Sequence, residues 1–305
     1  MASHPIITKP QRKPVPIAPE ADQWARMSLS ARERWLIELL DTLTDPESAM
    51  SEGRPHKKAK SQAADKLGLH FASIGRVVYL AEEMAVVYPG ERPITPDILA
   101  VLDVAEPEDD QRMAWVVLDE GKGVDLVLEV LHHGDRNKDL EENVERYAHL
   151  GIPEYFVYDR LRQRVVGYRL PPGASKYQPI IPQYGRYASR VLGLDLAIEH
   201  SELRFFHGMA ELFGSDELIG RLRSMVQDLE TKANQAQTQV DQAFADGLRQ
   251  ALLTIIEARA LPCPDDTRAR LVACTDVATL QRWVLRMATA SSVDVEALTL
   301  SPAEG

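Results

Sequence analysis

Residues 94–104 read ITPDILAVLDV, and residues 123–159 read GVDLVLEVLHHGDRNKDLEENVERYAHLGIPEYFVYD. Each segment contains an apolar run of strand length; Asp97 opens the first run and Glu129 lies inside the second. A carboxylate within a buried strand is unfavourable unless a cation meets it. Two such carboxylates on neighbouring strands would offer oxygen ligands to a hard divalent cation. A metal-dependent hydrolase is therefore the first hypothesis.

Composition limits the classes of protein to consider. The chain has 305 residues, 45% of them apolar, which is enough for at least one sizeable core. Its net charge of −11 argues against a protein that coats nucleic acid electrostatically, because phosphate binding depends on the density of Lys and Arg. One local basic cluster stands out against this background, and it comprises His56, Lys57, Lys58, Lys60 and Lys66.

Nothing in the sequence points to export or to a membrane. The proline-rich start, MASHPIITKPQRKPVPIAPE, lacks the apolar core of a signal peptide. No run approaches the ~18 apolar residues of a membrane span. The two cysteines, Cys263 and Cys274, have no metal-ligand spacing. We therefore expect a soluble, cytoplasmic protein with no membrane partner.

The order of the patterns predicts an α/β domain over residues 28–200, preceded by an irregular or disordered leader over residues 1–27. Helices are expected from Ser28 and from near Pro55, and a third over residues 138–150. Short β-branched and aromatic runs indicate the strands. These runs are residues 77–80, 84–87, 98–102, 115–118, 124–131, 155–158 and 165–170.

Residues 205–305 are predicted to be helical. Apolar or small residues repeat from Leu222 to Ala243 with alternating steps of four and three, the heptad rhythm of a coiled-coil seam, and a second helix should carry Leu252 and Ile256. Because many seam residues are alanines, an isolated pair of helices would be marginal. We expect a homodimer through this region. Docking of another protein or an intramolecular bundle are the alternatives.

Several motifs in this order resemble a known family, the Uma-type (Uma-two) putative restriction endonucleases of the PD-(D/E)xK nuclease superfamily. The Pro96-Asp97 pair is followed 32 residues later by Glu129, then by D-x-x-x-N-x-x-x-Y ending at Tyr147, and then by GIPEYFVYD. Upstream, SEGRPH resembles the segment in which a histidine opens the first core helix. The resemblance covers roughly residues 52–170.

The resemblance implies a restriction-endonuclease-like mixed sheet flanked by helices, and Mg²⁺-dependent hydrolysis of DNA phosphodiester bonds. Asp97 and Glu129 match the metal-binding carboxylates, whereas Glu52 and His56 match upstream residues that border the cleft. Mg²⁺ is a hard ion that takes one or two carboxylates together with water and phosphate oxygens, and Mn²⁺ could replace it.

The chain departs from the superfamily pattern at its lysine. Two residues after Glu129, where the superfamily has lysine, stands Leu131. Many Uma-type members instead have a lysine four residues before the tyrosine, but this chain has Asn143 there, which can donate a hydrogen bond but carries no charge. Lys138 is the nearest substitute, and it could reach the cleft only from a loop before the helix begins.

Two hypotheses follow. The first is a Mg²⁺-dependent endodeoxyribonuclease that uses Asp97, Glu129, Glu52, His56, Asn143 and Lys138. The second is a catalytically impaired protein of the same fold that binds DNA or another protein.

Overall fold

The computed structural model describes residues 14–43, 54–104, 111–131, 138–289 and 293. They divide into two compact units, residues 1–218 and 219–305. The first unit is a mixed α/β structure and the second is helical, which confirms the predicted fold class. None of the helices in the described ranges is long and apolar enough to cross a membrane.

The elements follow one another in a helix-rich, strand-rich and again helix-rich order. The helices are α1 (Ala21–Arg26), α2 (Leu29–Leu43), α3 (Arg54–Ser73), α4 (Val117–Glu120), the π-helical turn η1 (Lys138–Glu142), α5 (Asn143–His149), α6 (Ser215–Ala258), α7 (Asp265–Ala273) and α8 (Val277–Met287). The strands are β1 (Val78–Glu82), β2 (Val86–Val87), β3 (Ile98–Leu102), β4 (Trp115–Val116), β5 (Leu126–Val130), β6 (Glu154–Asp159), β7 (Arg164–Arg169), β8 (Gln178–Pro179), β9 (Tyr187–Ser189), β10 (Leu194–Glu199), β11 (Glu202–His207) and β12 (Ala210–Glu211).

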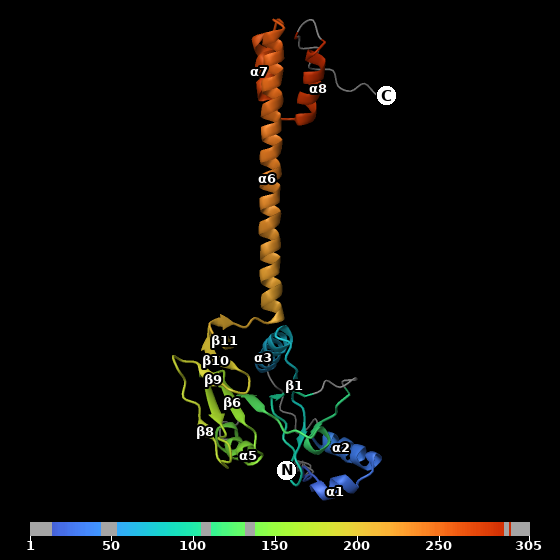
Figure 1. Ribbon diagram of the computed structural model, residues 1–305, viewed down its shortest axis with the longest axis vertical. Coiled ribbons are helices and arrows are strands. Elements are labelled where there is room, and N and C mark those ends of the chain that lie inside the picture. Colours follow the sequence, from blue (N-terminus) through green and yellow to red (C-terminus); the bar gives the residue numbers. More distant parts are fainter. Residues whose placement is uncertain (1–13, 44–53, 105–110, 132–137, 290–292, 294–305) are drawn as a thin grey trace, which may run out of the picture. The chain divides into compact units, whose positions relative to one another are not determined.

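The central sheet has six strands in the order β1-β3-β5-β6-β7-β8. Figure 1 labels β1, β6 and β8 of this sheet. β5 pairs with β6 in parallel and the other neighbours pair antiparallel, so the sheet is mixed. The register between β3 and β5 sets Ile98 opposite Leu128. Asp97, one residue before β3, is therefore brought beside Glu129 near the end of β5.

Alternation along β5 divides the core into two layers. Leu128 and Val130 pack in one layer together with Phe71 of α3. Val127 packs in the other layer with Tyr147 of α5. Successive side chains of a strand point to opposite faces, so Glu129 shares the α5 side of the sheet.

A second, four-stranded antiparallel sheet, β12-β11-β10-β9, was not predicted from the sequence. Its central strands, LDLAIE and ELRFFH, are mostly buried and do not alternate strictly between buried and exposed residues. The turn between them consists of His200 and Ser201, both with positive φ, of 52° and 65°. Two-residue hairpin turns normally contain Gly, Asn or Asp. This turn has none of them, so the sequence did not predict the hairpin.

The amino-terminal part of the described chain carries the short helix α1. Trp24 in α1 is 2% exposed, and its indole N–H donates to Asp119 Oδ1 at 2.8 Å. The Trp24 and Trp35 rings meet edge to face with centroids 5.8 Å apart. These contacts order residues that the sequence analysis assigned to the leader.

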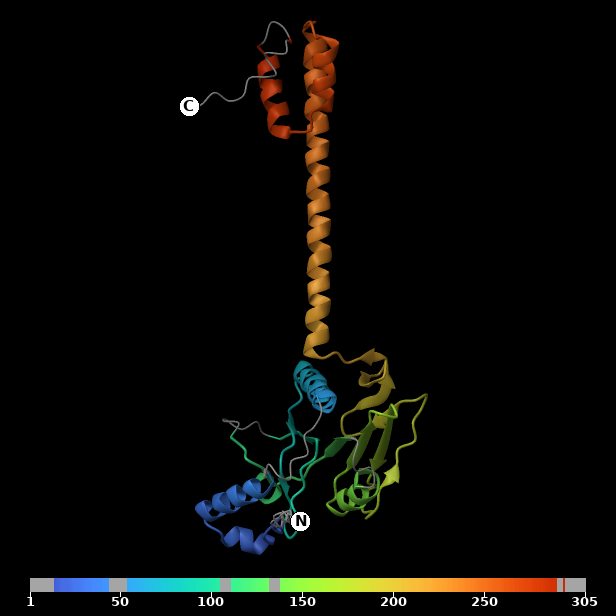
Figure 2. The ribbon, with the colours of Figure 1, turned by 180° about the vertical axis from the view of Figure 1, so that it is seen from behind.

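Two local expectations were wrong. The strand expected over residues 115–118 ends at Val116, because α4 begins at Val117. The two helices expected over the heptad region and around Leu252 are a single helix, α6, which continues through Gly247 and is uninterrupted in both views (Figures 1 and 2). An isolated glycine destabilises a helix by only about 1 kcal/mol, which does not force a break.

Helix α3 is tied to the beginning of α6 within the first unit. Asp65 accepts hydrogen bonds from Ser215 N at 2.6 Å and from Ser215 Oγ at 2.7 Å. The Asp65 carboxylate thus satisfies a backbone N–H at the start of α6 that has no intrahelical partner. α3 therefore contacts the sheet on one side and anchors α6 on another.

Candidate active site

Asp97 lies where the extended segment after Pro96 enters β3. Its Oδ2 accepts a hydrogen bond from the Val130 N–H at 2.7 Å, so the carboxylate spans from the start of β3 to the end of β5. The Asp97 side chain keeps 16% of its surface exposed. It is held in place by the backbone, yet it can still be reached from solvent.

Glu129 lies within β5 and is 5% exposed. Its Oε2 accepts from the Asp97 N–H at 3.3 Å, and its Oε1 accepts from the Tyr147 hydroxyl at 2.7 Å. Both carboxylate oxygens are therefore hydrogen-bonded, which lowers the cost of burying this charge. The two carboxylates singled out in the sequence are brought together at one edge of the central sheet.

Helix α3 supplies the positive charge at this edge. His56 Nε2 and Lys60 Nζ each lie 3.5 Å from Asp97 Oδ1. Lys60 Nζ also contacts Glu83 Oε1, on a residue held at φ 54°. Residues four apart share one face of a helix, so α3 presents His56 and Lys60 to the same carboxylate.

The surroundings of Asp97 act in opposite directions on its pKa. Burial alone would raise this pKa, because desolvation disfavours the charged carboxylate. The hydrogen bond from His56, the Val130 N–H and the charge of Lys60 outweigh the effect of burial and hold the pKa of Asp97 below its ordinary value. Asp97 is therefore ionised at neutral pH.

Helix α5 brings a polar face to the same side of the sheet as Glu129. Asn143, at the start of α5, is 3% exposed, and Tyr147 follows it on the same face four residues later. Leu131, at the usual motif-lysine position, is 5% exposed and packs in the apolar layer with Tyr147. Neither Leu131 nor Asn143 carries a charge to this edge.

Two of the residues proposed from the sequence are not placed. Glu52 lies outside the described residues. Lys138 is the first residue of η1, and its side chain is not described. The described part of the proposed site therefore consists of His56, Asp97, Glu129 and Asn143.

The structure adds two residues that sequence reasoning assigned to other roles. Lys60, 1% exposed, appeared in the sequence analysis only as a member of the basic cluster, and Tyr147 only as the end of a family motif. The available signal for Lys60 was its spacing of four from His56. Tyr147 carried a weaker signal, because a tyrosine inside an apolar helical face needs a partner for its hydroxyl.

A buried carboxylate nearby shows what a purely structural role looks like. Glu154, in the GIPEYFVYD segment, is 1% exposed and accepts from Arg169 Nε at 2.7 Å, Ser189 Oγ at 2.5 Å and Arg190 N at 2.9 Å. These donors join β6 to β7 and to the segment around β9. Glu154 has no second carboxylate beside it in these contacts, unlike Glu129.

The donor set at Asp97 and Glu129 fits a hard divalent cation. Carboxylate oxygens have more than one lone pair, so the hydrogen bonds already made do not exhaust them. No group of three or more His, Cys, Asp or Glu side chains gathers as a metal centre within the described ranges. An ion here would take these two carboxylates and complete its coordination with water and substrate oxygens, as Mg²⁺ commonly does.

Comparisons with known proteins show the family of this chain. The model of the family described as "Uma2: Putative restriction endonuclease" matches residues 32–199, more than half of the chain. No curated protein matches the sequence. A crystal structure of a putative nuclease belonging to DUF820 from Anabaena variabilis is similar at 16% identity and a TM-score of 0.39, over 50% of this chain and 82% of that one.

Proposed function

This chain belongs to the Uma2 family of putative restriction endonucleases, and we propose that it is a Mg²⁺-dependent endodeoxyribonuclease with Asp97 and Glu129 as its metal ligands. The observation that carries the proposal is that each of the two carboxylates accepts a hydrogen bond from the backbone of the neighbouring segment at the same end of β3 and β5. Glu129 Oε2 is 3.3 Å from the Asp97 nitrogen, and the Asp97 carboxylate bonds to the next residue of β5, Val130.

Each residue has a defined part in this proposal. A bound Mg²⁺ or Mn²⁺ would polarise the phosphoryl group and lower the pKa of a coordinated water. Asp97 and Glu129 hold the ion through their oxygens, and Tyr147 orients the Glu129 carboxylate by hydrogen bonding to Oε1. Asn143, on the same face of α5 as Tyr147, offers a neutral hydrogen-bond donor to water or phosphate.

Lys60 supplies the positive charge that is missing at positions 131 and 143. It is almost fully buried, so it acts on the substrate through Asp97 rather than by touching the phosphate. Its charge keeps Asp97 ionised, and its contact with Glu83 fixes the ammonium group at the edge of the sheet. Lys60 is therefore a positioning residue in this proposal.

A plasmid-nicking assay tests the activity. Supercoiled plasmid is incubated with the protein and Mg²⁺, Mn²⁺ or EDTA, and open-circular product is measured over time. We expect nicking that needs a metal ion and disappears in Glu129→Gln. Lys60→Gln should slow nicking, whereas Lys57→Gln, which removes an exposed lysine of the same helix, should not.

The competing function is that of a catalytically impaired nuclease fold that binds DNA or another protein. The neutral residues Leu131 and Asn143 favour it, because both positions for the motif lysine lack charge. Folded protein that binds DNA but nicks no plasmid with either metal ion would support this alternative and contradict the nuclease.

A further inference from the structure

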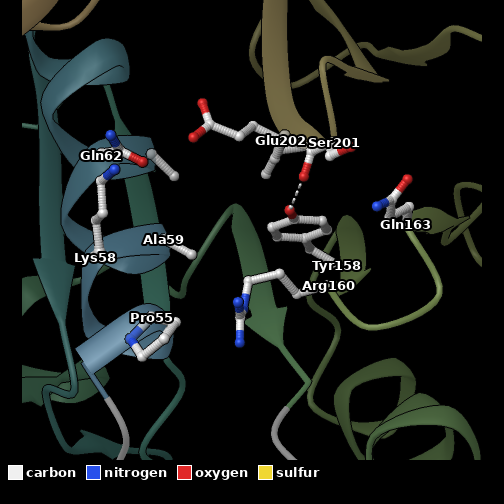
Figure 3. Close-up of a pocket in the computed structure, with 11 residues that line it drawn as sticks. Pro55, Lys58, Ala59, Gln62, Tyr158, Arg160, Gln163, Ser201 and Glu202 are labelled. Carbon is white, nitrogen blue, oxygen red and sulfur yellow. Dashed lines mark hydrogen bonds between the residues drawn. The ribbon is translucent and has the colours of Figure 1, made fainter.

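A cavity of about 370 Å³ opens beside α3, on a different face of that helix from His56 and Lys60. Lys58 and Gln62 of α3 line one side, whereas Tyr158 and Arg160 at the end of β6 and Glu202 of β11 line the other (Figure 3). Pockets that bind small ligands have volumes of roughly 300–1,000 Å³. The cavity is thus large enough for a nucleotide and larger than a phosphate group requires.

The charges in the cavity favour an anion. Lys58 and Arg160 contribute two cations, and the carboxylate of Glu202 is already paired, because Arg204 Nη2 donates to its Oε2 at 2.9 Å. Arg160 Nε is buried and makes no hydrogen bond to any residue in the described part of the chain. A buried donor of this kind is destabilising unless a ligand or water accepts from it.

The cavity adjoins the candidate active site through shared elements. Tyr158 of β6 lies opposite Val130 of β5, and the Val130 N–H donates to Asp97. α3 carries Lys58 toward the cavity and Lys60 toward Asp97. The cavity and the carboxylates therefore share α3 and the β5–β6 pair, although neither Asp97 nor Glu129 lines the cavity.

We propose that the cavity binds a nucleotide unit, with its phosphate between Lys58 and Arg160. The planar guanidinium of arginine suits bidentate bonding to phosphate, which would also give Arg160 Nε an acceptor. The Tyr158 hydroxyl donates to the Ser201 carbonyl oxygen at 3.4 Å, and its ring, 2% exposed, packs in the core and closes one side of the cavity (Figure 3). The assignment rests on the proposed function, because a nuclease of DNA presents such a unit as part of its substrate.

Binding in EDTA tests the cavity separately from catalysis. Anisotropy of a short fluorescein-labelled single-stranded oligonucleotide is measured from about 50 to 200 mM salt, a range over which phosphate contacts weaken strongly. We expect Arg160→Gln and Lys58→Gln each to weaken binding by about tenfold and to reduce the salt slope by about 0.7. Glu202→Gln should tighten binding, because among the described residues that line this cavity Glu202 alone is acidic.

The matched control is Lys57→Gln, an exposed lysine adjacent to Lys58 that does not line the cavity; its binding should stay near the wild-type value. Competition with a deoxynucleoside monophosphate separates a free nucleotide from a DNA strand as the source of the phosphate. Unchanged affinity and salt slope in folded Arg160→Gln would overturn the proposal, as would wild-type protein that binds neither probe. Binding without nicking would contradict the nuclease alone.

A second, independent feature lies on the first half of α6. The heptad assigns Ile219, Val226 and Val240 to position a and Leu222 and Leu229 to position d. Their exposed fractions are 44%, 54%, 62%, 59% and 62% in that order. Large apolar side chains with this much exposure along one helix face mark an interaction surface.

The geometry points to a second copy of this chain as the partner, in a parallel two-stranded coiled coil. β-branched residues at a with leucine at d favour that arrangement over other oligomers. In a parallel pair, Met225 would face Glu230 and Lys232 would face Gln237 of the other copy, so no like charges oppose each other. Ala233, Ala236 and Ala243 bury little, so the association is expected to be of modest strength.

Light scattering at tens of micromolar tests this association. We expect a dimeric mass for the wild type and a monomeric mass for Leu222→Glu/Leu229→Glu, while Ser224→Glu/Thr231→Glu on the opposite side of the heptad stays dimeric. In a Cys263→Ser/Cys274→Ser background, Leu222→Cys should form an intermolecular disulfide. A monomeric wild type overturns the pairing, and a dimer whose Leu222→Cys variant never cross-links overturns the parallel orientation.

Discussion

The β3–β5 edge and the first half of α6 depart from ordinary solvation in opposite directions. At the sheet edge, Glu129 and Lys60 are 5% and 1% exposed although both side chains carry charge in water. On α6, Leu222 and Leu229 are 59% and 62% exposed although both are apolar. The first region withdraws charge from water and the second leaves hydrocarbon in it.

The buried charges and the exposed apolar side chains differ in how completely the rest of the chain compensates them. The buried charges have partners within the same unit: Asp97 meets Lys60, and Glu129 meets Tyr147. Within the described part of a single copy, the exposed leucines of α6 lack such compensation. We therefore propose a small cation as the ligand of the sheet edge and another protein surface as the partner of the helix face.

Replacing Glu129 by glutamine should have the largest effect on activity at the sheet edge. The substitution keeps the size of the side chain but removes one of two metal-binding charges. Loss of a residue that only supports a metal ligand commonly lowers metal affinity or activity by ~10–100-fold, and loss of the ligand itself should exceed that. Nicking rates under saturating Mg²⁺ check this, and a rate within twofold of the wild type would remove Glu129 from the site.

Lys60→Met tests whether the buried charges depend on each other. Removing one partner from a buried ion pair leaves the other uncompensated, and we expect the free energy of unfolding to fall by roughly 2–3 kcal/mol. Urea denaturation measures this loss. Lys57→Met, an exposed change on the same helix, should alter stability by no more than about 0.5 kcal/mol.

The stability of Lys60→Met should also depend on pH differently from that of the wild type. The folded pKa of Asp97 is depressed, so its contribution to stability is present above the unfolded pKa, near 3.8, and is lost as pH falls toward the folded value. Without Lys60 the depression shrinks, and less stability remains to be lost below about pH 4. Urea midpoints from pH 7 to pH 3 should therefore fall less steeply in Lys60→Met than in the wild type. Parallel curves would show that Lys60 does not act on Asp97.

Tyr147→Phe asks how much of the compensation at Glu129 comes from a single hydrogen bond. The ring stays in the core while Oε1 loses its donor, which should lower the unfolding free energy by about 1.5–2 kcal/mol. Addition of Mg²⁺ should restore part of this stability if the ion takes over the unsatisfied oxygen. An equal deficit with Mg²⁺ and with EDTA would argue against metal binding at Glu129.

Ala233→Leu tests association through the exposed face of α6, and its expected effect is the smallest. A larger side chain at a seam position should strengthen association by about tenfold in the dissociation constant, since about 1.4 kcal/mol of extra apolar burial corresponds to that factor. Sedimentation at several concentrations measures the constant. Unfolding of the first unit should be unaffected, and a change there would mean that the leucine contacts something other than a second α6.

The sequence predicted the carboxylates at the sheet edge because both interrupt or begin long apolar runs, which is a local pattern. Lys60 could not be selected from the basic cluster in the same way, because Lys57, Lys58 and Lys60 read alike until the helix is placed against β3. Tyr147 depends on a contact to Glu129 that spans 18 residues and two elements. The periodicity of the sequence predicts which face of an element a residue occupies. Tertiary packing decides which residue it contacts across that face.

Helix α6 also shows what the sequence pattern predicted and what it missed. The heptad rhythm predicted a helix over residues 222–243, and α6 confirms it, whereas packing of the seam that carries Leu222 and Leu229 stays a prediction. The single length of α6 was missed: the helix expected around Leu252 continues the first one through Gly247 without a break. The hairpin at His200 and Ser201 was missed because its turn lacks glycine and asparagine.

Helix α3 meets the carboxylates through Lys60, the cavity through Lys58 and the start of α6 through Asp65. Each added residue turns a helix by about 100°, so a one-residue insertion after Lys60 would swing Asp65 away from Ser215 while leaving Lys60 in place. A deletion at the same point would do so in the opposite sense. Across lineages, α3 should therefore keep its length even where the loops on either side of it grow or shrink.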